Sequence, residues 1–180
     1  MRRKNVTNAI IRESITEALL ILMKQKPFAQ ISITEIVQKA GVGRVTFYRN
    51  YSGKEDVLVS ALNEAATDWW FAFRAEGRTD YVEALFTHCL TVKDIVLPLY
   101  EHGLIHLLFQ NVHDLIGPAD GDPESLSYQK SCLSGCVFGF LNEWVRRGMT
   151  DPPEKMSELF RDIQIDDLVQ SVIEQETLKQ

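Results

Sequence analysis

A short run near the N-terminus gathers the side chains best suited to binding an anionic partner. Arg44 and Arg49 carry guanidinium groups, and the hydroxyl groups of Thr46 and Tyr48 lie between them in the sequence. A guanidinium group can bind a phosphate or the edge of a guanine through two parallel hydrogen bonds, and hydroxyl groups also donate to phosphate oxygens. These residue types at this spacing predict a nucleic-acid contact, with Arg44 reading base edges.

The flanking sequence predicts the helices that must position these side chains. Ser32 and Glu35 form the pattern of a capping box, which indicates the start of a short helix. Gly41 and Gly43 then permit a sharp turn, and residues 44–50 predict a second short helix. A helix, a glycine-containing turn and a second helix form a unit that many proteins use to enter the major groove of DNA.

The charge of the chain is divided unevenly and supports the same interpretation. Residues 1–55 contain ten Lys and Arg against four Asp and Glu, a formal charge of +6, whereas residues 56–180 contain nine against twenty-one, a charge of −12. A basic segment joined to an acidic body is typical of a nucleic-acid-binding module attached to another domain. The alternative is a solvated basic corner of an ordinary helical protein.

The sequence around the turn resembles a known signature. Residues 40–55 read AGVGRVTFYRNYSGKE, which is similar to the helix-turn-helix signature of the TetR family of transcriptional regulators. The resemblance covers about residues 7–62. One position departs from the pattern, because Gly43 stands where the family usually has Ser or Thr, and Gly caps a helix somewhat less well than Ser.

The resemblance implies a set of DNA contacts and a partner. The residues that it places against the groove or the phosphates are Arg44, Val45, Thr46, Tyr48, Arg49 and Lys54. Among these, Arg44, Val45 and Arg49 occupy variable positions that set the operator sequence, and Lys54 is a phosphate contact. Phe47 and Tyr51 become packing residues. The implied partner is double-stranded operator DNA, bound by a homodimer.

Apolar residues recur at helical spacing along the rest of the chain, without a convincing pair of strands. Helices are expected at residues 7–26, 32–40, 44–50, 54–78, 81–93, 94–100, 104–116, 125–147 and 154–163, and the apolar spacing continues through Leu168, Val169, Val172 and Ile173. The predicted fold class is therefore all-α. A three-helix helix-turn-helix domain over residues 1–53 precedes a helical effector-binding and dimerisation domain over residues 54–180, whose first helix connects the two.

Aromatic side chains of the acidic half suit a small-molecule pocket, although such clusters also form ordinary helical cores. The residues expected to line a pocket are Trp69, Trp70, Phe73, Tyr100, His106, Phe109 and Phe138. Tyr100 and His106 supply the polar groups that would orient a ligand. The negative charge of this half favours a cationic or neutral ligand over an anion.

Small residues on the long helix at 125–147 suggest a subunit interface. Ser131, Gly135 and Gly139 recur at intervals of four, a spacing that lets another helix approach closely. Together with the helix at 154–163, this helix is predicted to form the two-fold contact of a homodimer. Packing inside one subunit is the alternative.

Other chemistry has little support in the sequence. His102 and His106 are spaced to share a metal with Cys89 or Asp94, but no established metal motif is present, and neither a metal nor a cofactor is expected. Three cysteines without a C-x-x-C pair are typical of reduced thiols in a cytoplasmic protein. No apolar run approaches the ~20 residues of a membrane span. Without a nucleophile elbow or a phosphate loop, the chain is not predicted to be an enzyme.

These observations favour a ligand-responsive regulator, and the resemblance implies a repressor that binds a palindromic operator. The alternative is a DNA-binding interaction protein that organises chromosome or division machinery and has no small-molecule inducer.

Overall fold

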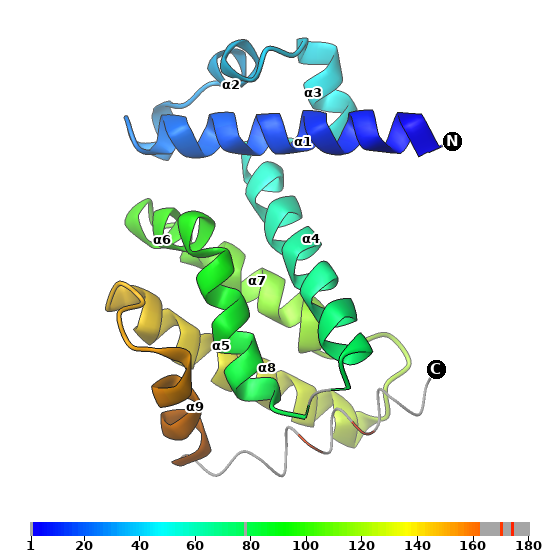
Figure 1. The fold of residues 1–180 in the computed structure, drawn as a ribbon, viewed down its shortest axis with the longest axis vertical. Helices are drawn as coiled ribbons and strands as arrows, with labels where there is room; N and C mark the ends of the chain where they lie inside the picture. The colour runs from blue at the N-terminus through cyan, green and yellow to red at the C-terminus, as the bar shows by residue number, and fades with distance from the viewer. Residues whose placement is uncertain (1, 78, 163–169, 171–173, 175–180) are drawn as a thin grey trace.

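The regular parts of the computed structural model are helical, and the structure describes residues 2–77, 79–162, 170 and 174 (Figure 1). The elements are α1 (Arg2–Met23), the short 3₁₀ helix η1 (Phe28–Gln30), α2 (Ile33–Ala40), α3 (Arg44–Asn50), α4 (Lys54–Ala75), α5 (Tyr81–Thr91), α6 (Lys93–Glu101), α7 (Ile105–Ile116), α8 (Glu124–Arg146) and α9 (Pro153–Asp162). Within these described ranges no strand occurs. The predicted all-α fold is confirmed.

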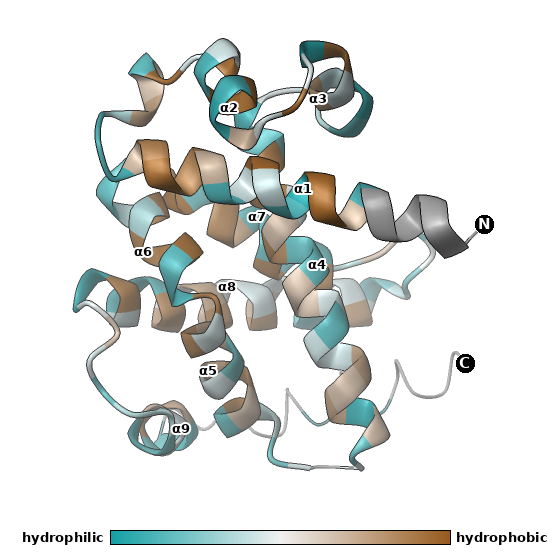
Figure 2. Cartoon of the chain, turned by 45° about the horizontal axis from the view of Figure 1, so that its top comes forward, coloured by the Kyte–Doolittle hydropathy of each residue, from teal (hydrophilic) through white to brown (hydrophobic). Residues whose placement is uncertain are grey.

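The first three helices form a head, in which α1 lies across the molecule with α2 and α3 on its outer side (Figure 1). Four apolar side chains at the contacts between these helices are fully buried. These residues are Ile15 and Leu19 of α1, Ile36 of α2 and Phe47 of α3. Apolar residues recur along α1 between polar ones (Figure 2), so this helix has one face available for the core.

α4 leaves the head and descends into a body made of α5 to α9 (Figure 1). It packs against α7, and α7 packs along α8, while α5 contacts α9. A single cluster of buried apolar side chains runs from the head through Leu62 of α4 to Trp144 of α8. The head and the body are therefore joined by packing as well as by the chain.

Most helix ends lie within two residues of the predicted positions, and three differ by more, one of which is the end of α1 at Met23 instead of residue 26. α1 begins at Arg2 instead of residue 7, since no Pro or Gly in residues 2–6 stops a helix there. α4 ends at Ala75 instead of residue 78, because Gly77 adopts a left-handed conformation with φ 64°. The predicted apolar spacing of residues 168–173 falls on Leu168, Val169, Val172 and Ile173, which lie outside the described residues.

Candidate functional site

Local interactions in the α2–turn–α3 unit set the direction of α3. The Ser32 hydroxyl accepts a hydrogen bond from the Glu35 N–H at 3.3 Å, and the Glu35 carboxylate accepts one from the Ser32 N–H at 3.0 Å, which confirms the predicted capping box. A hydrogen bond from Lys26 is the largest of the effects that lower the pKa of Glu35 to about 2. Gly41 ends α2 in the left-handed region at φ 67°, and Gly43 begins α3 without a side-chain cap.

The outer face of α3 presents most of the side chains that the sequence assigned to DNA. Arg44, Val45, Tyr48 and Arg49 are exposed and together line a shallow hollow, and Thr46 is half-buried beside them. The Arg44 guanidinium lies 5.7 Å from the centre of the Tyr48 ring. On the opposite side, Phe47 is fully buried and contacts the Tyr48 and Tyr51 rings at centroid distances of 5.5 and 5.8 Å. One inward aromatic residue thus holds a helix whose polar side faces solvent.

Lys54 has a different place from the phosphate contact that the resemblance implied. Its Nζ donates hydrogen bonds to the carbonyl oxygens of Phe28, at 2.6 Å, and Ile31, at 2.9 Å, and lies 4.4 Å from the centre of the Phe28 ring. A longer hydrogen bond reaches the Ala29 carbonyl oxygen at 3.4 Å, so all three donors of the lysine ammonium are directed to the head. In this structure Lys54 therefore holds η1 against the start of α4, and we expect this contact to be its main role, while the predicted phosphate contact stays a prediction.

Replacing Lys54 by methionine is expected to lower the stability of the protein by roughly 1–3 kcal/mol, because two partly buried carbonyl groups lose a charged donor. The dependence of DNA affinity on salt should stay unchanged, since no phosphate contact is removed. Urea denaturation and DNA titrations at several salt concentrations measure both quantities. A salt dependence that flattens by about 0.9 per subunit in logarithmic units, with unchanged stability, would restore the phosphate contact.

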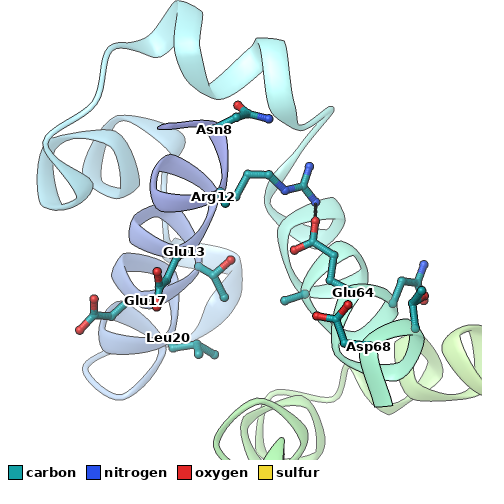
Figure 3. A pocket seen from close by; sticks show the side chains of 12 residues that line it. Asn8, Arg12, Glu13, Glu17, Leu20, Glu64 and Asp68 are labelled. Carbon is teal, nitrogen blue, oxygen red and sulfur yellow. Dashed lines mark ion pairs between the residues drawn. The ribbon is translucent and has the colours of Figure 1, made fainter. Parts of the chain in front are cut away.

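Arg12 connects three helices where the head meets α4. Its guanidinium lies 5.0 Å from the centre of the Tyr51 ring at the end of α3, and it pairs with Glu64 of α4 (Figure 3). An open cleft of about 820 Å³ separates α1 from α4 here, and its wall carries the carboxylates of Glu13, Glu17, Glu64 and Asp68. The ion pair bridges this cleft. Through Arg12, the end of α3 at Tyr51 is therefore connected to α4 at Glu64.

His102 joins the head to the body at a second point. The Phe28 N–H donates to His102 Nδ1 at 3.3 Å, so Nε2 carries the ring proton and donates to the Met23 carbonyl at 3.0 Å. Both ring nitrogens of a residue at the end of α6 are thereby bonded to the backbone between α1 and α2. The sequence analysis considered His102 and His106 as a possible metal-binding pair. In the structure His102 instead connects the head to the body through these two hydrogen bonds.

The body contains a cavity of about 540 Å³ between α4, α5, α7, α8 and α9. Trp69 and Trp70 of α4 line it, as expected, together with Val112 and His113 of α7 and Val137 of α8. Its remaining apolar wall comes from Tyr81, Val82, Leu85, Leu115, Ile116, Leu133 and Phe160. Its volume and apolar lining fall within the range of small-molecule sites.

The other five residues expected at a pocket lie elsewhere. Phe73 is buried in the core beside the cavity, where its ring packs on Trp70, while Tyr100, His106 and Phe109 are exposed. Phe138 is half-buried and meets Phe109 edge to face, with centroids 5.1 Å apart. α7 buries Leu107, Leu108 and Val112. His106 and Phe109 share a side of α7 with His113, at i, i+3 and i+7, but only the last part of α7, from Val112 to Ile116, lines the cavity, so His113 is the histidine that reaches it.

Sequence reasoning missed the buried charged residue in the cavity wall. Lys130 of α8 is almost fully buried, and its Nζ lies 3.0 Å from Asp122 Oδ2 in a pair whose carboxylate side chain is completely covered. The Ala119 N–H also donates to this carboxylate, at 2.9 Å. A signal was present, because Lys130 falls at helical spacing between Leu126 and Leu133 on the buried stripe of α8.

The outward face of α8 carries the small residues that the sequence assigned to a subunit interface. Ser131, Gly135 and Gly139 are all exposed, and a Cβ atom added at either glycine would meet nothing within 4 Å. Tyr128 and Cys132 lie on the same face and are also exposed. Within one subunit this face therefore has no packing partner among the described residues.

The described part of the chain shows no group of three or more His, Cys, Asp or Glu arranged to hold a metal ion. The three cysteines are free, and burial raises the pKa of the Cys89 thiol to about 12. Among the helices that the structure describes, none is both long and apolar enough to cross a membrane.

Comparison with known proteins gives one family profile on the head, one curated relative and one solved structure to report. The sequence profile described as "Bacterial regulatory proteins, tetR family" matches residues 15–61. A curated relative, the uncharacterized HTH-type transcriptional regulator YxbF of Bacillus subtilis (strain 168), is 27% identical over 70 residues, which are 37% of this chain and 18% of that protein. The match thus spans less than a fifth of that relative. Among solved structures, the dihydroxyacetone kinase operon activator DhaS aligns over 91% of this chain and 97% of its own, with 19% identity and a TM-score of 0.49.

Proposed function

We propose that this chain is a helix-turn-helix transcriptional regulator of the TetR family, which represses transcription as a homodimer and is released from a palindromic operator by a small molecule. In this proposal residues 1–53 bind DNA and residues 54–180 form the effector-binding and dimerisation domain. The observation that carries it is the outer face of α3, where Arg44, Val45, Tyr48 and Arg49 are exposed around the buried Phe47.

The proposed division of labour on α3 follows from position and chemistry. Arg44 lies in the first turn of the helix, where a recognition helix contacts base edges, and Val45 is 73% exposed beside it. Tyr48 follows near the end of the helix and is assigned to a phosphate, with Thr46 before it, while Arg49 joins Arg44 and Val45 as a residue that sets the operator sequence. Base contacts specify the sequence, whereas phosphate contacts fix the register.

Selection of operator fragments from a randomised DNA pool tests this proposal. The purified full chain should enrich a two-fold symmetric site, and Arg44→Ala should lose the preference at one base pair of each half-site. Tyr48→Phe should leave the preference intact and weaken binding to all sequences alike, because a phosphate contact carries no sequence information. No enriched site, or an Arg44→Ala variant with the same preference, would refute the assigned roles.

The proposed dimer uses the outward face of α8 together with α9. Gly135 and Gly139 leave this face flat and open. In α9, the next helix along the chain, the apolar side chain of Leu159 is 42% exposed. Close packing of two such helices against their copies would bury these apolar groups, and a regulator that reads two half-sites requires a two-fold partner.

Replacing Gly139 by leucine is expected to weaken the dimer by about 1–3 kcal/mol through overpacking while leaving the subunit folded. The subunit tolerates the change because a Cβ at Gly139 meets no atom within 4 Å. Sedimentation at decreasing protein concentration should show dissociation earlier than for the wild type, with an unchanged melting curve of the monomer. Thr87→Leu, at an exposed position of α5, is the matched control. A fully dimeric Gly139→Leu variant would place the interface elsewhere.

The cavity supports the ligand-responsive form of the proposal over an interaction protein without an inducer. Trp69 and Trp70 place its wall on α4, the helix that runs directly into the head. Next to the cavity wall on α7, Asn111 Nδ2 donates to Asn63 Oδ1 of α4 at 2.6 Å. If α4 can take two positions relative to the body, a ligand that binds better to one of them would shift the population toward it. The contacts of Arg12 and His102 between the head and the body would then change the orientation of the head.

A further inference from the structure

Val45 occupies the centre of the outer face of α3. Successive residues of an α-helix are turned by about 100°, so Val45, two positions before the buried Phe47, points about 160° away from it. Arg44 and Tyr48 lie on one side of Val45 and Arg49 lies on the other, and all four line the same shallow hollow. When α3 enters a groove, Val45 is therefore the side chain that points most directly at the base edges.

The packing of the subunit gives no reason for an apolar side chain at this position. Val45 is 73% exposed, the largest exposed fraction among the large apolar residues whose burial the structure describes. Its neighbours in the hollow carry guanidinium and hydroxyl groups, so Val45 is the aliphatic member of a polar surface. Single apolar residues are common on protein surfaces, but this one lies at the centre of the face assigned to DNA. Such a side chain gains from burial when the group opposite to it is also apolar.

The major groove of DNA offers one apolar group to such a side chain, the 5-methyl group of thymine. Guanine presents two acceptors there, cytosine a donor, and adenine one acceptor and one donor. Any of these edges pressed against Val45 would lose water without gaining a hydrogen bond. The thymine methyl group would instead be buried against the two methyl groups of the valine, as in other apolar contacts with thymine.

Arg44 supplies the contact beside it. Its guanidinium lies 5.7 Å from the centre of the Tyr48 ring, and the preferred base for a guanidinium in the major groove is guanine, through O6 and N7. Consecutive Cα atoms are about 3.8 Å apart and successive base pairs are about 3.4 Å apart. Side chains at adjacent positions of α3 therefore match adjacent base pairs.

We propose that Val45 contacts the 5-methyl group of a thymine in each operator half-site, beside the guanine that Arg44 binds. This inference rests on the proposed function as an operator-binding regulator, and it names a base that the operator contains.

Selection from a randomised DNA pool with the full chain gives the first measurement. The wild type should enrich a thymine next to a guanine in each half-site. Val45→Ala should lose the preference for thymine and keep the guanine, whereas Arg44→Ala should lose the guanine and keep the thymine. Both residues are exposed, so the melting curves of the two variants should match that of the wild type.

Replacing the selected thymine by uracil isolates the methyl group, because uracil forms the same base pair without it. Loss of one buried methyl group should weaken binding by the wild type about fourfold per half-site, or roughly fifteenfold for a dimer on two half-sites. Val45→Ala should reduce the ratio between the thymine and uracil duplexes to about twofold or less. Tyr48→Phe on the same helix is the matched control, since it should weaken binding to both duplexes alike and keep the wild-type ratio.

The proposal is overturned if the wild type binds the uracil duplex as tightly as the thymine duplex, or if Val45→Ala keeps the wild-type ratio. Enrichment of a two-fold symmetric site without dependence on a thymine methyl group refutes the role of Val45 and leaves the proposed regulator intact. If the wild type enriches no site, the proposed function fails and this inference fails with it.

Discussion

Replacing Phe47 by alanine is expected to unfold the head and abolish DNA binding. Phe47 is fully buried, and it is the side chain through which α3 reaches the core beside Ile15 and Leu19 of α1. Truncation of a buried phenylalanine costs about 3–5 kcal/mol, which is a large part of the total stability of a small domain. The loss should appear as an earlier first transition in thermal unfolding followed by circular dichroism, with no operator binding at temperatures above it.

Val45→Ala is the matched control on the same helix. Val45 is 73% exposed, so its truncation should leave the melting curve within about 0.5 kcal/mol of the wild type and affect only the choice of operator sequence. A Phe47→Ala protein that melts like the wild type and still binds the operator would mean that α3 is held by other contacts.

Replacing Lys130 by methionine is expected to destabilise the body by about 3–5 kcal/mol, because it leaves a buried carboxylate without its cation. The Asp122 side chain is completely covered and lies 3.0 Å from Lys130 Nζ, so no solvent can replace the lost partner without rearrangement of the loop between α7 and α8. Urea denaturation should show a lower midpoint with an unchanged slope.

The double variant Lys130→Met/Asp122→Asn should recover most of this loss, since neither charge remains to be desolvated. Lys155→Met provides the exposed counterpart. Lys155 pairs with Asp151 on the surface, where such pairs contribute about 0–1 kcal/mol, so its removal should be nearly silent. Equal effects of Lys130→Met and Lys155→Met would show that the Lys130 pair is not buried in solution.

The helix-turn-helix unit could be predicted from the sequence because its determinants are local. Ser32 and Glu35 are three residues apart and form their hydrogen bonds within one turn of helix. Gly41 supplies the left-handed conformation that ends α2, at the position where the sequence predicted the turn. Apolar spacing likewise predicted the helices of the body, since the 3.6-residue repeat requires no knowledge of the neighbours that a helix will contact.

Tertiary packing alone decided what the polar side chains of these helices contact. A helix sequence shows which residues share a face, but the opposing elements decide which face meets a cavity, a core or solvent. They also decide which end of a helix reaches a cavity, so the cavity contains His113 and Lys130 instead of His106 and Tyr100. His102 and Lys54 bond to the backbone around η1, from 74 and 26 residues away in the chain. Partners at such separations are selected by the packing of the whole core, which no local pattern in the sequence encodes.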